Sequence, residues 1–396
     1  MRGSRLVLVL VLTAAAFFAG GAMLSRYVAG GGPLSTPQGA ASVYRQVLGD
    51  LKSHYYRSVN VDKIAQKGIN DTLAALKDPY TQYFTPKQAK AFEQLLAGSY
   101  SGIGTELQPK GKRLIVARVF RDSPAAKAGV RSGDVIVSVN GKAALGQPVE
   151  LVATRVRGRA GTTVRLVLKR PAAGRLLKLA IVRSELTYPL TTSRIIDDHG
   201  KKIGYVSLSQ FATGAGEQIR QAVESLQKRG AQRLVLDLRD NGGGLVDEAV
   251  KVAADFLPSG SVVVSTQGLH SPREVLRTKD APASTLPLVV LVNGNTASAS
   301  EIVSGALQDH HRATLIGTRT FGKGVVQEEL PLSNGAVLKI TVAAYRTPQG
   351  RNINHKGIEP TIVVKVPMAA ATTSGTGSSK SDPVLQRALR YLVTGH

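Results

Sequence analysis

The sequence contains no cysteine, and aromatic residues make up only 5% of its 396 residues. The absence of cysteine excludes disulfide bonds, a cysteine nucleophile, a thiolate metal site and a lipid-modified cysteine anchor, but it does not choose a compartment. Acidic residues are also few, because 27 Asp and Glu stand against 51 Lys and Arg, a net charge of +24. A surface this basic attracts either nucleic acid or anionic lipid headgroups.

The membrane interpretation of this charge is favoured, because the basic residues are spread through amphipathic segments and no RNA- or DNA-binding motif stands out. An uncharged run from Leu6 to Leu24 follows Arg2 and Arg5. Residues 1–27 are therefore predicted to be a signal peptide or a single membrane anchor. We expect the rest of the chain to be extracytoplasmic, on the periplasmic or cell-envelope side, and secreted if this segment is cleaved. We expect no nucleic-acid partner.

Helical periodicity begins after a Gly/Pro-rich linker. Thr85 and Pro86 provide a cap and a first-turn proline for a third helix. These features predict a small helical domain over residues 40–97. The first two helices carry the apolar stripes Tyr44, Val47, Leu48, Leu51, Tyr55 and Ile64, Gly68, Ile69, Leu73, Leu76.

From residue 98 the pattern changes to strands and turns. The series SPAAKAGVRSGDVIVSVNGK, residues 123–142, resembles a PDZ domain, predicted here over residues 98–185. The resemblance implies that the domain binds a protein C-terminus as an added strand, with the terminal carboxylate held by backbone N–H groups. The loop implied for this role is Ser101, Gly102, Ile103 and Gly104. In the alternative interpretation, these glycines only form a turn.

After Glu185 strands and helices alternate, which predicts an α/β core over residues 186–368. The apolar run Leu234–Leu238 is followed directly by the glycine-rich loop Asp240–Gly244. Such a loop can cradle phosphate, but no G-K-[ST] accompanies it and the Rossmann spacing is absent, which argues against a nucleotide. Residues 369–382 are predicted to be a low-complexity linker. Residues 383–396 are predicted to form a helix that docks on the core or on a second subunit, which leaves a homo-oligomer open.

Ser298 follows a predicted buried strand, Leu288–Val292, at the point where a helix begins. Unpaired N–H groups and the positive end of the helix dipole gather there and favour developing negative charge. Lys323 lies between two glycines, and Gln327 would share its face in an extended strand. The residues alone leave a simpler interpretation open, in which Ser298 and Glu301 form a capping box and Lys323 is a solvated turn residue.

The whole constellation resembles the C-terminal processing peptidases, the tail-specific serine proteases of peptidase family S41A. The shared motifs are TASASEI at 296–302, FGKG at 321–324, DLRDNGGG at 237–244 and DPYTQYF at 78–84. The resemblance implies a ClpP/crotonase-like α/β core with Ser298 as nucleophile, Lys323 as general base and Gln327 as the residue that orients the lysine. It also implies an oxyanion hole from the amides of Ala299 and of Gly243 or Gly244. No metal or cofactor is implied.

Local chemistry agrees with these roles. A serine hydroxyl becomes a good nucleophile only when a base takes its proton, and lysine serves as that base when desolvation lowers its pKa. Gln327 is neutral, so it can accept a hydrogen bond from the amine without holding the amine in its charged form. We therefore expect a serine endopeptidase that cleaves exported proteins recognised through apolar C-terminal tails. The alternatives are a non-proteolytic PDZ scaffold or chaperone and, less favoured, a crotonase-like acyl-CoA enzyme.

Overall fold

The structure is a computed structural model that describes residues 36–120, 122–171, 174–365 and 382–395. The chain divides into two compact units, one up to Tyr83 and one from Phe84 onward. The predicted N-terminal signal or anchor and nearly all of the predicted linker lie outside the described residues. Within the described ranges, no helix combines the length and the apolar character that a membrane span requires.

The first unit contains the helices α2 (Pro37–His54) and α3 (Val61–Ala74), with the strand β1 (Gln82–Phe84) at its boundary. Thr36 and Asn60 cap the two helices by accepting hydrogen bonds from backbone N–H groups of their first turns. The helices meet where the Tyr44 hydroxyl lies against Gly68, at a place where a Cβ would collide with the ring. Both predicted helices are present, but their apolar stripes remain partly exposed, and Val47 is 48% accessible.

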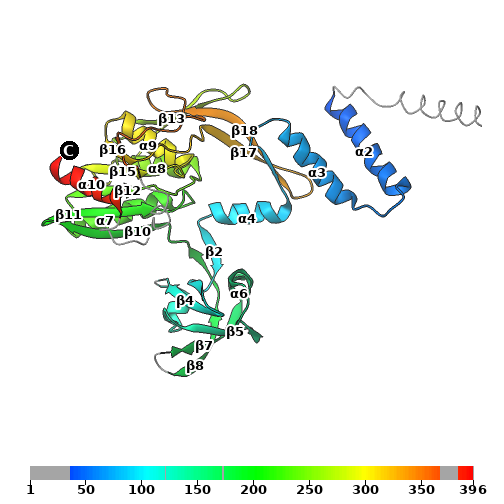
Figure 1. The fold of residues 1–396 in the computed structure, drawn as a ribbon, viewed down its shortest axis with the longest axis horizontal. Helices are drawn as coiled ribbons and strands as arrows, with labels where there is room; N and C mark the ends of the chain where they lie inside the picture. Colours follow the sequence, from blue (N-terminus) through cyan, green and yellow to red (C-terminus); the bar gives the residue numbers. More distant parts are fainter. Residues whose placement is uncertain (1–35, 121, 172–173, 366–381, 396) are drawn as a thin grey trace, which may run out of the picture. The chain divides into compact units, whose positions relative to one another are not determined.

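The region that resembles a PDZ domain is an antiparallel sheet (Figure 1). It has its own apolar core. Its strand order is β3-β4-β5-β7-β8, with β6 paired to β5. A separate pair, β2 (Ser99–Gly102) and β9 (Ser184–Thr187), brackets the region in sequence. The remaining elements are β3 (Thr105–Lys110), β4 (Arg113–Val119), α5 (Pro124–Lys127), β5 (Val135–Val139), β6 (Lys142–Ala143), α6 (Val149–Val156), β7 (Thr163–Arg170) and β8 (Arg175–Val182).

The α/β core is built on a second sheet with the order β10-β11-β12-β15-β16-β19. The first pair is antiparallel and the other neighbours are parallel. Because β12 and β15 run parallel, their carboxyl ends lie at the same edge, where the glycine-rich loop and the Ser298 turn follow them. The strands are β10 (Thr191–Asp198), β11 (Lys201–Leu208), β12 (Arg233–Asp237), β15 (Leu288–Val292), β16 (Ala313–Gly317) and β19 (Ile362–Val363).

Helices cover both faces of this sheet (Figure 1). The strand residues alternate, so that Leu234 and Leu236 pack with α7 (Ala215–Lys228), α8 (Val246–Ala254) and α9 (Ala299–Asp309). Val235, between them, packs with α10 (Pro383–Thr394) on the other face. The predicted C-terminal helix therefore forms and packs on the core of its own chain.

A third sheet, formed by β14-β13-β18-β17, carries the residues that follow Lys323. Its strands are β13 (Val262–Gln267), β14 (Glu274–Arg277), β17 (Val325–Pro331) and β18 (Val337–Arg346), and all of these pairings are antiparallel. The helix α4 (Pro86–Leu96) is closed by a capping box between Thr85 and Gln88. The Lys339 ammonium lies 4.7 Å from the centroid of the Phe92 ring on α4, which joins this helix to the third sheet.

Asp255, at the end of α8, predicts a pH dependence of stability. Its side chain is 2% exposed and its Oδ1 pairs with Arg220 at 2.9 Å, while its Oδ2 has no partner among the described residues. Burial raises the pKa of Asp255 to about 7. In the unfolded chain the Asp255 carboxyl ionises near its ordinary pKa of 3.8. The stability that folding gains from the raised pKa is therefore fully present below pH 3.8. It is then lost as the pH rises through about 7.

We therefore expect Asp255→Asn to have a larger free energy of unfolding than the wild type at pH 8, by on the order of 2 kcal/mol. The measurement is urea unfolding, in which the variant should unfold at a higher urea concentration. The advantage should shrink as the pH is lowered toward 4. The exposed variant Glu274→Gln serves as the control and should follow the wild-type curve. Parallel stability curves for Asp255→Asn and wild type across this pH range would contradict the prediction.

Candidate active site

Ser298 is the last residue of the connection between β15 and α9, directly before the helix begins. Its backbone has φ 57° and ψ −117°, a conformation that costs a residue with a side chain on the order of 1–3 kcal/mol. Hydrogen bonds on both sides hold the turn in place. The Ala297 N–H donates to the Asn241 carbonyl at 3.0 Å, and the Ser298 N–H donates to Glu301 Oε2 at 2.9 Å. A strained position that is fixed by its surroundings is typical of functional turns.

Ser298 lines a cavity of about 470 Å³ together with Lys323 and Gln327. The glycine-rich loop contributes Gly243 and Gly244 to the same cavity. The structure thus brings five residues predicted for catalysis to one place, and the sixth, Ala299, directly follows Ser298 in the chain. Apolar side chains complete the wall, namely Phe92, Leu95, Leu96, Leu245, Val246, Ile302, Val325 and Val326.

The expected reason for the meeting of Lys323 and Gln327 is wrong. Lys323 precedes β17 rather than lying in it, and the register of β17 shifts between Val326 and Gln327. A shared strand face therefore does not bring them together. Both side chains nevertheless line the same cavity.

The glycines beside Lys323 allow backbone to approach the lysine loop closely. A Cβ on Gly324 would lie 2.5 Å from the Asn354 N, and one on Gly322, whose φ is +91°, would lie 2.9 Å from the Gly357 N. The Gly324 N–H donates to Asn354 Oδ1 at 3.2 Å. Segment 354–357 thus forms a wall against the loop that no larger residue at these two positions would permit.

Glu301 makes more contacts than the capping box predicted from the sequence. Its carboxylate is fully buried and accepts from the N–H groups of Ser298 and Lys323, each at 2.9 Å. It also accepts from the Gly322 N–H at 2.8 Å and the Thr320 hydroxyl at 2.5 Å. The capping-box pattern pointed to its contact with Ser298, but nothing local indicated the contacts with the lysine loop.

Tyr345 makes the complementary contacts to carbonyl groups. Its buried hydroxyl donates to the Lys323 carbonyl and lies 3.2 Å from the Ser298 carbonyl. The main chains of Ser298 and Lys323 are therefore joined twice, through their N–H groups by Glu301 and on their carbonyl side by Tyr345. This double connection fixes the spacing between the two segments that carry the predicted nucleophile and base.

The glycine-rich loop presses against the Ser298 turn. A Cβ on Gly243 would lie 2.7 Å from the Ala297 carbonyl oxygen and 2.9 Å from the Ala299 N. The Gly243 N–H already donates to Asn241 Oδ1 at 2.9 Å. Within the described part of the chain, the N–H groups of Gly244 and Ala299 donate to no protein acceptor. This distribution favours Gly244 over Gly243 as the loop's donor to a ligand oxygen.

The predicted carboxylate-binding loop is shorter than expected. Ser101 and Gly102 belong to β2, where they pair with Glu185 and Ser184. This distant pairing places the two residues in a strand and leaves Ile103 and Gly104 as the connection to β3. Of the four predicted residues, only Gly104 lines the nearby cavity of about 550 Å³.

That cavity lies along β3 and α6, whose Leu107, Val149 and Val156 supply apolar wall. Aromatic and basic side chains also line it, and the ring centroids of Tyr100 and Tyr188 lie 5.2 Å apart. Arg157 lies 5.9 Å from the centroid of the Tyr100 ring. Burial raises the pKa of the Tyr100 hydroxyl to about 12. The groove is therefore lined by apolar, aromatic and basic side chains.

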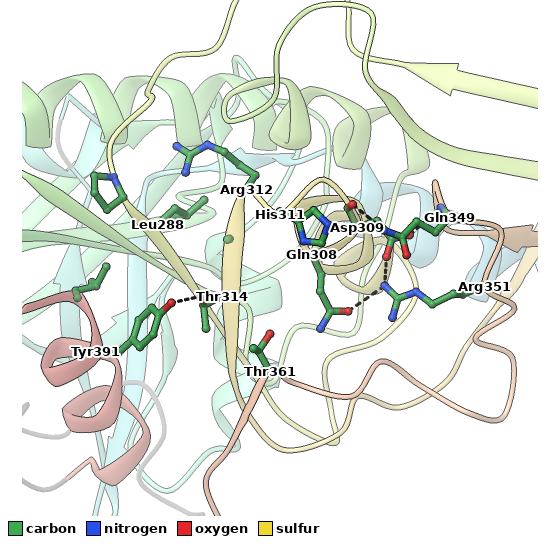
Figure 2. Close-up of a pocket in the computed structure, with 13 residues that line it drawn as sticks. Leu288, Gln308, Asp309, His311, Arg312, Thr314, Gln349, Arg351, Thr361 and Tyr391 are labelled. Atoms are coloured by element: carbon green, nitrogen blue, oxygen red, sulfur yellow. Dashed lines mark hydrogen bonds and ion pairs between the residues drawn. The ribbon is translucent and has the colours of Figure 1, made fainter. Parts of the chain in front are cut away.

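A further cavity of about 540 Å³ lies at the amino ends of β15 and β16 (Figure 2). Ser298 follows the carboxyl end of β15, at the opposite edge of the sheet. Its most polar part is occupied by an internal network, in which Arg351 pairs with Asp309 and donates to Gln308. Its lining includes neither serine nor lysine. Among the described residues, no cluster of three potential metal ligands occurs here or elsewhere. This cavity therefore does not contain the Ser/Lys pair predicted from the sequence.

Comparison with known proteins decides the family. Residues 202–364 match the model of peptidase family S41, and residues 115–170 match that of a PDZ domain. The carboxy-terminal processing protease CtpA of Bacillus subtilis (strain 168) is 34% identical over 80% of this chain, which covers 67% of that protein. This chain belongs to peptidase family S41. The expected family, the PDZ domain and the α/β fold class are thereby confirmed, whereas the domain bounds stay predictions.

Other relatives of this S41 chain agree. A probable CtpA-like serine protease of Staphylococcus haemolyticus (strain JCSC1435) is 36% identical over 80% of this chain, which spans 63% of that protein. The match thus spans about two thirds of the length of these relatives. A solved structure of a putative S41 protease from Bacteroides fragilis NCTC 9343 matches with a TM-score of 0.52 and 16% identity, over 89% of this chain and 97% of that one. At that identity the likeness shows the fold alone.

Proposed function

We propose that this S41 protein is a serine endopeptidase in which Ser298 is the nucleophile, Lys323 the general base and Gln327 the residue that orients the lysine. The observation that carries the proposal is the single cavity that Ser298, Lys323, Gln327 and Gly244 all line. Support also comes from the strained Ser298 backbone and from the double connection through Glu301 and Tyr345. A capping serine and a solvated lysine would need none of these features.

The cycle begins when neutral Lys323 Nζ takes the proton of Ser298 Oγ, and the oxygen attacks the carbonyl carbon of the peptide bond. The oxyanion of the tetrahedral intermediate accepts hydrogen bonds from the N–H groups of Ala299 and Gly244. Protonated Lys323 returns its proton to the departing amine as the C–N bond breaks. Water, deprotonated by Lys323, then attacks the acyl-enzyme, and Ser298 leaves with that proton.

Substrate selection is proposed to lie in the PDZ domain. An extended protein C-terminus would pair with β3, place apolar side chains against Leu107, Val149 and Val156, and direct its carboxylate to the Ile103–Gly104 connection. We further propose that these substrates are exported proteins. That part rests on the predicted signal or anchor in residues 1–27, as do the extracytoplasmic location and any membrane attachment. The oligomeric state stays a prediction.

The test incubates an unfolded protein that ends in apolar residues with wild type, Ser298→Ala and Lys323→Ala. We expect fragments from wild type, none from Ser298→Ala, and at least about a 10²-fold lower rate from Lys323→Ala. The wild-type rate should fall as the pH is lowered, because protonated Lys323 cannot accept the serine proton. The same substrate with a charged tail is the matched control and should be cleaved more slowly. If the protein only binds tails, Ser298→Ala should bind them as well as wild type does. If wild type produces no fragments even with a tail peptide in the PDZ groove, the proposal is refuted.

A further inference from the structure

A buried ion pair network joins the glycine-rich loop to the C-terminal helix α10. Arg239, next to the loop, is 9% exposed and lies between two carboxylates. Its Nε and Nη2 donate to Asp237 at 3.0 and 2.6 Å. Its Nη1 and Nη2 donate to the two oxygens of Asp382 at 3.0 and 2.7 Å. A guanidinium held on two sides in this way has little freedom to rotate.

Asp382 is also the N-cap of α10. Its Oδ1 accepts from the N–H groups of Val384 and Leu385, at 3.1 and 3.0 Å. The helix that it begins is anchored by an apolar face against β12, β15 and β16. The carboxylate thus transmits the fixed position of a packed helix to Arg239. These charges stabilise one another, and the pKa of Asp382 is held below its ordinary value despite its burial.

The other end of α10 is attached independently of the loop. Arg233 Nε donates to the Leu392 carbonyl at 2.6 Å, and the Thr314 hydroxyl donates to the Tyr391 hydroxyl at 2.8 Å (Figure 2). Loss of these contacts would loosen the helix without touching Arg239. They therefore provide matched controls for the contact at Asp382.

From Arg239 the connection continues to the Ser298 turn. Two residues further on, the buried Asn241 side chain donates to the Leu208 carbonyl and accepts from the Gly243 N–H. The Asn241 carbonyl accepts from the Ala297 N–H and from the Ser300 hydroxyl. A displacement of the chain at Arg239 is thus passed to the loop that presents Gly244 and to the turn that carries Ser298.

We propose that Asp382 is a positioning residue for the reaction, which holds the oxyanion loop through Arg239. The inference rests on the proposed function for its catalytic consequence. Asp382 lies outside the segment 202–364 that matches the S41 family, so the helix after the family segment completes the site. Through this link α10 orders the loop before substrate binds. It acts on the rate of the chemical step rather than on substrate affinity.

The test compares Asp382→Asn with wild type in the full chain. Asparagine caps helices as well as aspartate does, so α10 keeps its N-cap, while an amide replaces the carboxylate that faces the guanidinium. We expect kcat to fall roughly tenfold with KM unchanged. Backbone hydrogen exchange in residues 238–245 should become faster. Asp382→Ser, which also caps the helix, should show both effects and covers the case in which the asparagine variant folds poorly.

Tyr391→Phe and Arg233→Gln are the controls, and both should keep wild-type kcat and wild-type exchange in residues 238–245. In the Arg239→Lys background, Asp382→Asn should add no further loss, because lysine cannot bridge two carboxylates. If backbone hydrogen exchange in residues 238–245 is the same in Asp382→Asn as in wild type, the inference is overturned. It is also overturned if this exchange becomes faster while kcat stays unchanged. If wild type cleaves nothing, the proposed function fails. The exchange measurement then still decides whether Asp382 holds the loop.

Discussion

Replacing Glu301 with alanine should abolish peptide cleavage and lower the free energy of unfolding by at least about 4 kcal/mol. The buried carboxylate accepts from three N–H groups and one hydroxyl, and each buried donor left without a partner costs roughly 1–3 kcal/mol. The change also disconnects the turn that carries Ser298 from the loop that carries Lys323. Activity should therefore be lost in the fraction of the protein that still folds.

The measurement pairs urea unfolding with the cleavage assay. Glu301→Gln should be nearly as severe, because each carboxylate oxygen accepts two hydrogen bonds and the amide would turn one oxygen into a donor facing two donors. Glu359→Gln is the control, since its pair with Arg319 is 57% and 65% exposed, and should change stability by less than about 1 kcal/mol. Wild-type activity in Glu301→Gln would show that the connection does not set the geometry of the site.

The sequence was most informative where burial dictates the residue type. The run Leu288–Val292 predicted β15 with its observed bounds, because five consecutive apolar residues suit a strand covered on both faces. The place of Ser298 between this strand and α9 followed from the change of period after it. The glycine-rich loop could be placed in the same way, because it follows another apolar strand directly.

Contacts between distant segments could not be read from local pattern. Asp382 lies 143 residues from Arg239, and the N–H groups that Glu301 accepts from the lysine loop lie 21 and 22 residues away. The pairing of Ser101 and Gly102 with β9, which shortened the predicted loop, spans more than eighty residues. The choice between Gly243 and Gly244 depended on the Asn241 side chain, whose orientation no spacing rule specifies.

Gly243→Ala should reduce kcat by at least about 10²-fold, in the range seen when an oxyanion-hole donor is removed. The new methyl group would lie 2.7 Å from the Ala297 carbonyl oxygen, 2.8 Å from the Ser298 Cβ and 2.9 Å from the Ala299 N. These are backbone atoms and a Cβ, so no flexible side chain can move aside. The loop or the Ser298 turn must shift, and either movement separates Ser298 and the amide of Ala299 from the amide of Gly244. The φ of +97° at Gly243 adds backbone strain for any other residue.

Gly242→Ala is the matched control, because a Cβ there meets nothing within 4 Å and its backbone has no left-handed φ. Both variants remove one glycine from the same loop and restrict the unfolded chain equally. A difference between them therefore measures the close approach at Gly243 rather than the flexibility of the loop. Steady-state kinetics should show wild-type kcat for Gly242→Ala and an unchanged KM for both. Equal kcat values for the two variants would mean that the loop can withdraw from Ser298 without loss, which is incompatible with an oxyanion donor at Gly244.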